Sequence, residues 1–365
     1  MVTERAAMLR AIDLAWRGWG QVHPNPMVGA VVLADDAIVG EGYHAVFGER
    51  HAERIALEQA GPQARGGTLI VTLEPCSHEG KQPPCVDAVI EAGVSRVVMA
   101  LADPNPQAAG GAHRLAQAGV EVYTGLLAPE ACRQNAGFLH RFRRPERPWV
   151  ALKLATSIDH RIADGSGNAK WVSGPEAREY IHGLRAGFDA IAVGAGTVRA
   201  DDPRLTVRGA TRARIAPTRV VFTRSGNIPR NASVIATAGE VPTWLVSVGP
   251  GHPPPPEPAG SGVAGVTLVQ APTLEQAMAE LRSAGITTML VEGGGGLAGA
   301  LLEAGLVDRF YWVQSPLWLG TDGVPATRAL TGAPLAEAER WTVIERRSLG
   351  QDTLLVMDRK PCLPD

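Results

Sequence analysis

The sequence predicts an α/β protein of two domains, and three observations support this prediction. Segments with the apolar spacing of strands alternate with segments of helical spacing along most of the chain, which is typical of a sheet covered by helices. The chain has 365 residues. A domain with a single hydrophobic core is usually shorter than this, so two domains are expected. A basic, proline-containing stretch at residues 141–148 interrupts the alternation and is typical of a domain boundary.

The first half begins with a predicted amphipathic helix and continues as strands and helices in alternation. Asp35 and Asp36 form the expected turn between its first two strands. Because the ends of core strands are the usual place for a site in such sheets, polar residues that follow these strands are candidate functional residues. The helices are expected at residues 8–19, 51–60, 85–92 and 112–118, and the strands at residues 27–33, 37–42, 68–73 and 96–100.

The alternation resumes after the basic stretch. Residues 249–262 contain the run PPPPEPAGSG, which indicates a surface loop rather than a third domain junction. The strands of this half are expected at residues 149–155, 190–193, 219–222, 243–248, 287–291 and 309–313, and the helices at residues 175–186, 274–284 and 297–303.

Composition excludes several classes of protein. Lys and Arg number 35 against 37 Asp and Glu, a net charge of −2, which argues against a nucleic-acid-binding surface. No apolar run approaches the roughly 18 residues of a membrane span, and the first twenty residues carry charges at helical spacing rather than the apolar core of a signal peptide. With four cysteines, a disulfide framework is not expected, and we expect a cytoplasmic protein.

A split cluster in the first quarter of the chain predicts a zinc site. His51 and Glu53 open one predicted helix, Cys76 follows a predicted strand, and Cys85 opens the next helix. One imidazole and two thiols suit Zn²⁺ and leave a coordination position for water, as in catalytic rather than structural zinc sites. Glu53 lies two residues from His51, where it can act on that water as the general acid and base. This is the arrangement of zinc deaminases, although eight residues rather than two separate the cysteines.

Further polar residues lie in loop-forming contexts around this cluster, namely Asn25, His44, Lys81, Asp103 and Asn105. Asn25 and Asn105 each stand between prolines, which fix the neighbouring backbone angles. Such an asparagine either presents its amide to a ligand or forms a turn, and the sequence leaves both open.

The second half carries weaker signals. Residues 293–296 are four glycines between a predicted strand and a predicted helix, which indicates either a phosphate-binding helix start or a tight turn. Their spacing does not match the dinucleotide-binding Rossmann fingerprint. Arg185 and Arg208 could bind a ribose phosphate through two parallel hydrogen bonds or could be solvated surface residues.

Eight segments in order carry a resemblance to a known family. The first half contains HPNPMVGAVV, GYHAVFGERHAE, TLEPCSHEGKQPPC and ADPNPQ, and the second contains LKLATSIDHRIA, KWVSGPEAR, TVRADDPRLTVR and VEGGGGLAGALLEAGLVD. Together they resemble the bifunctional deaminase–reductase of riboflavin biosynthesis, over nearly the whole chain. The resemblance implies a cytidine-deaminase-like three-layer α/β/α domain at residues 1–144, followed by a dihydrofolate-reductase-like α/β domain at residues 149–365.

The family implies two consecutive reactions. The first removes the 2-amino group of 2,5-diamino-6-(5-phosphoribosylamino)pyrimidin-4(3H)-one with one Zn²⁺ per chain. The second uses NADPH to reduce the ribosyl side chain of the resulting uracil to ribityl. The implied partners are this small-molecule substrate and further copies of the chain in a homo-oligomer, with no nucleic acid and no membrane.

The resemblance also implies roles for individual residues. Lys153 is our candidate catalytic residue of the reductase, where it would polarise the sugar carbonyl of the ring-opened substrate. Ala169 stands where the family usually has a serine that contacts the substrate. The implied lining of the deaminase pocket is Asn25, His44, Lys81, Asp103 and Asn105. The implied NADPH-binding residues are Ala155, Trp171, Thr197, Asp201, Thr223, Gly294, Gly295, Gly296, Leu297, Ala298, Gly299 and Ala300. The implied residues for the reductase substrate are Ala169, Arg185, Leu205, Arg208 and Glu292.

Three alternatives remain at this point. The chain could deaminate another nucleobase or nucleoside and carry a degenerate second domain, which NADPH oxidation with the riboflavin precursor would exclude. It could be a non-catalytic protein with structural zinc, against which the open coordination position and Glu53 argue. It could be a reductase alone, which a stoichiometric zinc ion would contradict.

Overall fold

A computed structural model describes residues 1–80, 82–226, 228–249, 264–328 and 330–360. Lys81 and nearly all of the predicted proline-rich loop lie outside the described residues. The described chain divides into two compact units, Met1–Arg143 and a second unit that begins at Arg144. Both units combine a sheet with flanking helices, so the predicted α/β class is confirmed.

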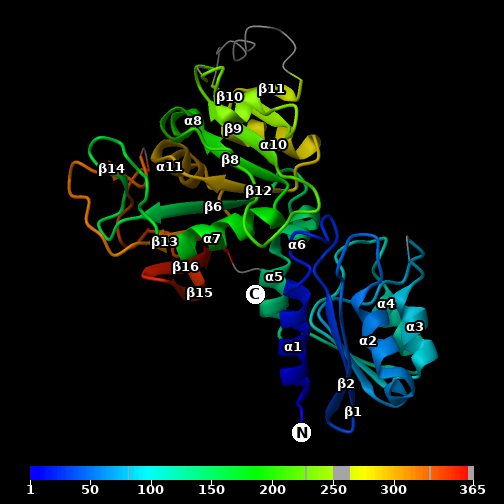
Figure 1. Ribbon diagram of the computed structural model, residues 1–365. Coiled ribbons are helices and arrows are strands. Elements are labelled where there is room, and N and C mark those ends of the chain that lie inside the picture. Colours follow the sequence, from blue (N-terminus) through cyan, green and yellow to red (C-terminus); the bar gives the residue numbers. More distant parts are fainter. Residues whose placement is uncertain (81, 227, 250–263, 329, 361–365) are drawn as a thin grey trace. The chain divides into compact units, whose positions relative to one another are not determined.

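The first unit is built on a five-stranded mixed sheet (Figure 1). The first strand, β1, runs antiparallel to its two neighbours, β2 and β3, while β3, β4 and β5 run parallel to one another. Because parallel strands end at the same edge of a sheet, the segments that leave β3 and β4 start side by side. In spatial order the strands are β2 (Ala37–Tyr43), β1 (Gly29–Ala34), β3 (Thr68–Val71), β4 (Arg96–Met99) and β5 (Glu121–Thr124).

Helices cover both faces of this sheet. In β1, Ala30 and Val32 pack into the core beneath one helical layer, while Val31 and Leu33 pack into the core beneath the other, because successive strand residues point to opposite faces. This is the predicted three-layer α/β/α arrangement. The first layer consists of α2 (Ala52–Ala60), the short helix η1 (Gly61–Ala64), α3 (Cys85–Ala92) and α4 (Gly111–Gln117), and the second of α1 (Glu4–Trp16), α5 (Ala128–Gln134) and α6 (Ala136–Arg143).

The first helix begins earlier than its apolar spacing predicted. The Thr3 hydroxyl accepts a hydrogen bond from the Ala6 N–H at 3.2 Å and caps the helix, so α1 starts at Glu4 rather than at residue 8. It also ends at Trp16, three residues before the predicted end at residue 19. The polar N-cap, rather than the first apolar residue, therefore marked the start.

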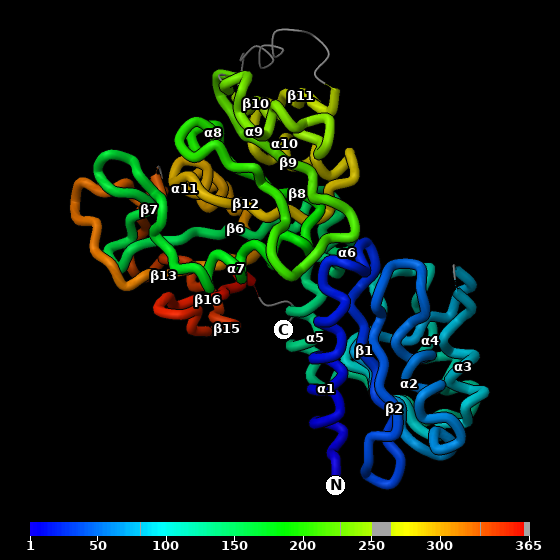
Figure 2. Tube along the Cα trace, in the orientation of Figure 1, coloured from blue at the N-terminus to red at the C-terminus, as the bar shows by residue number. Residues whose placement is uncertain are grey.

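The second unit is built on a nine-stranded sheet (Figure 2). Seven neighbouring strands, from β11 to β13, run parallel, and the last two strands form an antiparallel hairpin at one edge. The spatial order is β11 (Val266–Ala271), β10 (Thr243–Val248), β9 (Thr218–Thr223), β8 (Ala190–Gly194), β12 (Thr288–Glu292), β6 (Trp149–Thr156), β13 (Arg309–Gln314), β16 (Asp352–Asp358) and β15 (Thr342–Leu349).

Helices also pack on both faces of the second sheet. α10 (Leu274–Ser283) and α11 (Gly295–Glu303) share one core, and α8 (Ala195–Asp201) and α9 (Ser233–Ala236) share the core of the opposite face. Among the described residues, no helix has the length and apolarity needed to cross a membrane. The remaining elements are α7 (Pro175–Leu184), the short helix η2 (Arg185–Gly187), and a separate pair of short strands, β7 (Arg161–Ala163) and β14 (Val324–Pro325).

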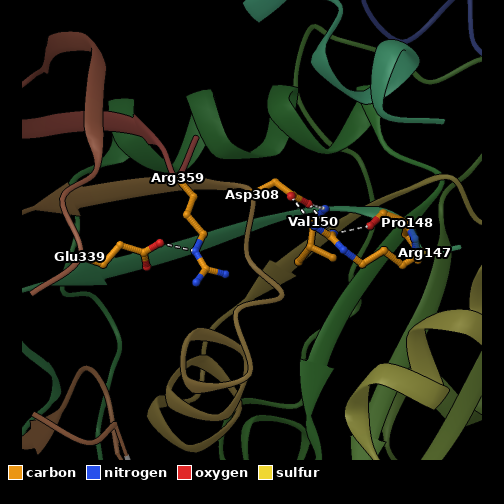
Figure 3. A network of polar contacts seen from close by, with 6 residues as sticks. All are labelled: Arg147, Pro148, Val150, Asp308, Glu339 and Arg359. Atoms are coloured by element: carbon orange, nitrogen blue, oxygen red, sulfur yellow. Dashed lines mark hydrogen bonds and ion pairs between the residues drawn. The ribbon is translucent and has the colours of Figure 1, made fainter. Parts of the chain in front are cut away.

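An ion pair fixes the start of the first strand of the second unit (Figure 3). The guanidinium of Arg147 donates to both carboxylate oxygens of Asp308 at 2.6 Å, and the same carboxylate accepts the Val150 N–H at 2.9 Å. Arg359 and Glu339 form a second, more exposed ion pair in the same view. The basic stretch thus ends in a buried arginine that joins the start of β6 to the residue preceding β13.

Candidate functional site

The predicted zinc ligands converge in the first unit. His51 is the N-cap residue of α2, Cys85 is the first residue of α3, and Cys76 lies in the loop that follows β3. The Nδ1 atom of His51 lies 3.2 Å from the Cys85 sulfur and 3.5 Å from the Cys76 sulfur. One ligand atom from each residue lies within 4.8 Å of the others, and no further His, Cys, Asp or Glu of the described chain joins this group.

The three donors fit a tetrahedral zinc ion. With Zn–S near 2.3 Å and Zn–N near 2.0–2.1 Å, tetrahedral geometry separates an N and an S ligand by about 3.6 Å, close to the two separations in the structure. Cys85 is fully buried and Cys76 is 8% exposed. Hydrogen bonds from Cys85 and His51 lower the pKa of Cys76, which favours the thiolate that binds metal. Three protein ligands leave the fourth position for water or substrate.

Glu53 lies in the first turn of α2 and is 3% exposed. Burial raises the pKa of its carboxyl group, and the neighbouring His51 acts in the opposite direction. A buried carboxyl group with a raised pKa can both accept and donate a proton near neutral pH. The structure therefore places a suitable proton carrier beside the metal ligands without making it a ligand.

These residues border a cavity of about 310 Å³. Within it, the His44 Nδ1 lies 3.2 Å from the Arg50 carbonyl oxygen, so this nitrogen carries the hydrogen and Nε2, 3.4 Å from the Asn25 amide nitrogen, acts as acceptor. Burial lowers the pKa of His44 and favours this neutral form. The lining includes His51, Glu53 and Cys76 together with four of the five predicted pocket residues, Asn25, His44, Asp103 and Asn105.

The sequence analysis missed the role of Glu74. Its carboxylate accepts the N–H groups of Asp103, Gly110 and Ala112 at 2.9, 3.1 and 2.9 Å. It thereby shapes the loop that brings Asp103 to the cavity, where burial raises the pKa of Asp103 to about 6. The only available signal was that Glu74 follows a predicted strand two positions before Cys76.

The cavity also contains residues that sequence reasoning assigned elsewhere or passed over. Arg141 was part of the predicted boundary, yet it lines the cavity from α6. No pattern around it indicated a ligand, because its position depends on how α6 packs. Further lining residues that were not predicted include Phe47, His78, Gln82 and Phe138.

A second cavity, of about 920 Å³, lies within the second unit. Four residues predicted to bind NADPH do not line it: Thr223, Ala298, Gly299 and Ala300. The other predicted reductase residues all line it, namely Lys153, Ala155, Ala169, Trp171, Arg185, Thr197, Asp201, Leu205, Arg208, Glu292, Gly294, Gly295, Gly296 and Leu297.

The glycine-rich segment forms the start of α11. Gly294 is the N-cap residue, has a φ of 75° and offers no side chain to cap the helix, so the first N–H groups of α11 are available to a ligand. A Cβ on Gly296 would meet no atom within 4 Å, whereas a Cβ on Gly299 would lie 1.8 Å from the Arg328 carbonyl oxygen. Gly296 therefore keeps the helix start open, and Gly299 permits close packing. The segment fits the phosphate groups of a dinucleotide.

Arg185 is positioned differently from the predicted bidentate phosphate ligand. Its Nε and Nη2 donate to the two carboxylate oxygens of Glu292 at 2.6 and 2.9 Å, and its Nη1 donates to the Thr206 carbonyl at 2.7 Å. The Nε and Nη2 groups of Arg185, which would form two parallel hydrogen bonds with a phosphate, thus bind Glu292 instead. Glu292 is paired in register with Lys153 on the adjacent strand β6, and burial lowers the pKa of Lys153 while Glu292 opposes that change.

His182 is a further lining residue that the sequence analysis did not identify. It lies in the last turn of α7, three positions before Arg185, and burial together with Arg185 and Arg208 lowers its pKa. Other cationic lining residues absent from the prediction are Lys170, Arg178, Arg204 and Arg328. Such a concentration of positive charge suits a phosphate-rich ligand.

Two family models match the chain. The model described as the cytidine and deoxycytidylate deaminase zinc-binding region matches residues 1–101, and the RibD C-terminal domain matches residues 148–355. The first match contains His51, Glu53, Cys76 and Cys85, and the second contains the residues that line the larger cavity.

Similar proteins cover almost the whole chain. The riboflavin biosynthesis protein RibD of Escherichia coli is 41% identical over 95% of this chain and 97% of its own length, and that of Bacillus amyloliquefaciens is 40% identical over 88% and 87%. Among solved structures, Acinetobacter baumannii RibD has a TM-score of 0.82 at 36% identity, covering 97% of this chain and 98% of that one. A diaminohydroxyphosphoribosylaminopyrimidine deaminase/5-amino-6-(5-phosphoribosylamino)uracil reductase from Thermotoga maritima has a TM-score of 0.79 at 33% identity with the same coverage.

Proposed function

Because the chain belongs to the RibD family of riboflavin biosynthesis proteins, we propose that its two cavities carry out two consecutive steps on one phosphoribosylaminopyrimidine. The protein is a bifunctional enzyme, a zinc-dependent deaminase and an NADPH-dependent reductase. We assign the deaminase to residues 1–144 and the reductase to residues 149–365. A lone deaminase with a degenerate second domain is not favoured, because the RibD C-terminal domain matches residues 148–355.

In the deaminase, His51, Cys76 and Cys85 hold the zinc ion, which acts as a Lewis acid and lowers the pKa of water. Glu53 would accept a proton from the attacking water and pass it to the ring nitrogen. It would then take the second proton from the hydroxyl group formed on the ring carbon and pass it to the amino group, which leaves as ammonia. The observation that carries this assignment is that His51, Cys76 and Cys85 lie within 4.8 Å of one another at a cavity lined by His51, Cys76 and Glu53.

The pyrimidine and its phosphoribosyl group occupy the rest of this cavity. Asp103 has a carboxyl group of raised pKa that can accept an N–H group of the base, and the neutral His44 accepts from the Asn25 amide and so orients that amide toward the base. Asn25, Asn105 and, outside the described residues, Lys81 complete the proposed substrate contacts.

In the reductase, the start of α11 binds phosphate groups of NADPH, which supplies the hydride. Lys153 would polarise the C1′=N bond of the ring-opened substrate and donate a proton to that nitrogen as C1′ receives the hydride. The Arg185–Glu292 pair holds a carboxylate beside Lys153 and so keeps that amine oriented. Leu205, Arg208 and position 169 contact the substrate, and Ala155, Trp171, Thr197 and Asp201 contact the rest of the cofactor, whereas Thr223 lies outside the cavity lining.

A two-stage assay tests this function. The zinc-loaded enzyme is supplied with 2,5-diamino-6-(5-phosphoribosylamino)pyrimidin-4(3H)-one, first without and then with NADPH. Ammonia is expected in the first stage, and oxidation of NADPH in the second. Absence of ammonia release by enzyme that contains one zinc per chain would contradict the proposed deaminase, and absence of NADPH oxidation after ammonia release would contradict the reductase.

We also propose that the chain forms a homo-oligomer in the cytoplasm and binds neither nucleic acid nor membranes. The support is the family to which the chain belongs and, for nucleic acid, the net charge of −2. Light scattering of the purified protein is expected to give a multiple of the chain mass, and a monomer would contradict the proposed assembly.

A further inference from the structure

The deaminase cavity has an unequal distribution of charge. Its described lining contains three carboxyl groups, those of Glu53, Glu74 and Asp103, and one guanidinium group, that of Arg141. The proposed substrate carries a phosphate, which is a dianion near neutral pH and needs a cationic partner when it leaves water. Among the described lining residues, Arg141 is the cation that stays protonated at every working pH.

Arg141 is held in a defined position. It lies in the last turn of α6 and is partly buried, with its guanidinium 5.1 Å from the ring centre of Phe138 and 4.8 Å from that of Phe142. Its Nη1 also donates to the Pro24 carbonyl oxygen at 3.3 Å. Stacking on aromatic rings restricts a long side chain, so less conformational entropy is lost when it binds a ligand. A guanidinium has five N–H donors, so it can bind the Pro24 carbonyl and a phosphate together.

We propose that Arg141 binds the phosphate of the deaminase substrate and thereby positions the pyrimidine over Glu53 and the metal ligands. This inference rests on the proposed deaminase function. It assigns the part of the cavity beside Arg141 to the non-reacting end of the substrate.

The same contacts connect the phosphate to the base. Arg141 binds the carbonyl of Pro24, the next residue is Asn25, and the amide of Asn25 contacts the Nε2 of His44. A phosphate on Arg141 therefore stabilises the loop that presents Asn25 to the base. Binding energy from a remote part of a substrate can be used to orient the reacting part, so loss of this contact lowers kcat as well as raising KM.

Two of the acidic lining residues accept hydrogen bonds from the backbone. Glu74 accepts three backbone N–H groups, and Asp103 accepts the Asn105 N–H at 2.9 Å. Both carboxylates thus shape the loop between β4 and α4. Their charge repels a phosphate, which leaves the face that carries Arg141 as the favourable place for it.

The test compares two substrates and three variants. The substrates are the phosphorylated aminopyrimidine and the same molecule after removal of its phosphate. Arg141→Met keeps an apolar stem for the aromatic rings and removes the charge, and Arg141→Gln keeps a donor for the Pro24 carbonyl. Arg143→Met is the matched control, since Arg143 lies on the same helix, is exposed and does not line the cavity.

For the wild-type enzyme, kcat/KM for deamination is expected to be at least about 10-fold higher with the phosphorylated substrate. Both Arg141 variants should lose about 10- to 100-fold on that substrate, the usual range for a hydrogen bond to a charged group, while their activity on the dephosphorylated substrate changes less than threefold. Zinc content and reductase activity should stay unchanged, and Arg143→Met should resemble the wild type on both substrates.

Two results would overturn the inference. One is a wild-type enzyme that deaminates both substrates equally well, which does not depend on any variant folding. The other is an equal loss on both substrates in Arg141→Gln with zinc retained, which would give Arg141 a purely structural role. A wild-type enzyme that deaminates neither substrate would instead contradict the proposed function itself.

Discussion

The deaminase site takes its reactive groups from side chains that begin helices or follow strands, whereas the reductase cavity combines backbone at the start of α11 with side chains from several other elements. In the first, His51, Glu53, Cys76 and Cys85 have chemistry that few other residues can supply. In the second, Gly294 and Gly296 act by having no side chain. A site made of reactive side chains is therefore recognisable from its residue types, whereas the four glycines alone left a phosphate-binding helix start and a tight turn equally open.

The largest expected effect tests the side-chain site. Glu53→Gln should lower deaminase kcat by about 10²–10⁴-fold, the range for loss of a general acid–base group, because an amide cannot carry the protons. Zinc content and NADPH oxidation with 5-amino-6-(5-phosphoribosylamino)uracil should not change. Glu58→Gln is the matched control, since Glu58 lies on the same helix and forms an exposed ion pair with Arg50. Retention of deaminase activity in Glu53→Gln would remove Glu53 from the mechanism.

Lys153→Met tests the one side chain to which we give a chemical role in the reductase. We expect reductase kcat to fall about 100-fold, in the lower part of the range for proton transfer by a positioned side chain, with ammonia release unaffected. The exposed Lys360 provides the control variant, Lys360→Met. An unchanged reductase kcat in Lys153→Met would exclude this role.

Gly296→Ala tests the backbone site. A Cβ at this position would meet no protein atom within 4 Å, so the fold should tolerate it, but the methyl group would stand at the helix start where phosphate binds. The KM for NADPH should rise about 10-fold, equivalent to about 1.4 kcal/mol, without a change in melting temperature. The control is Gly332→Ala, at an exposed glycine whose Cβ would also meet no atom within 4 Å, and it should leave the KM for NADPH unchanged. An unchanged KM for NADPH in Gly296→Ala would show that the start of α11 does not bind the cofactor.

The smallest expected effect concerns stability and pH. Burial raises the pKa of Asp103 from 3.8 to about 6, so its ionised form is less stable in the folded unit than in the unfolded chain. Asp103→Asn should therefore raise the melting temperature of the deaminase unit above pH 6, by roughly 2–4 °C, and this gain should disappear as the pH falls toward 4. A gain that is equal at pH 5 and pH 8 would show that ionisation of Asp103 is not its cause.

The comparison also explains what the sequence could predict. The strands with strong apolar runs and the grouping of His51, Cys76 and Cys85 were predicted correctly, because periodicity and metal chemistry are local properties. The helix start at Thr3, strand β5 and the hairpin of β15 and β16 were missed, since they depend on a cap or on pairing with distant strands.

The roles of residues that act through tertiary contacts could not be predicted from local sequence patterns either. Arg185 and Glu292 are 107 positions apart and were both assigned to the substrate, whereas the structure pairs them with each other. Arg141 belonged to a basic run that looked like a boundary, and only the packing of α6 brings it to the deaminase cavity.

The assignment of the two reactions to two separate parts of the chain is the central claim, and Cys85→Ser tests it most directly. Zinc content, ammonia release and NADPH oxidation are measured on the same preparation, with each reaction supplied with its own substrate. Loss of zinc and of ammonia release with an unchanged rate of NADPH oxidation is the predicted result. Loss of both reactions in a folded variant, or ammonia release without zinc, would contradict the account.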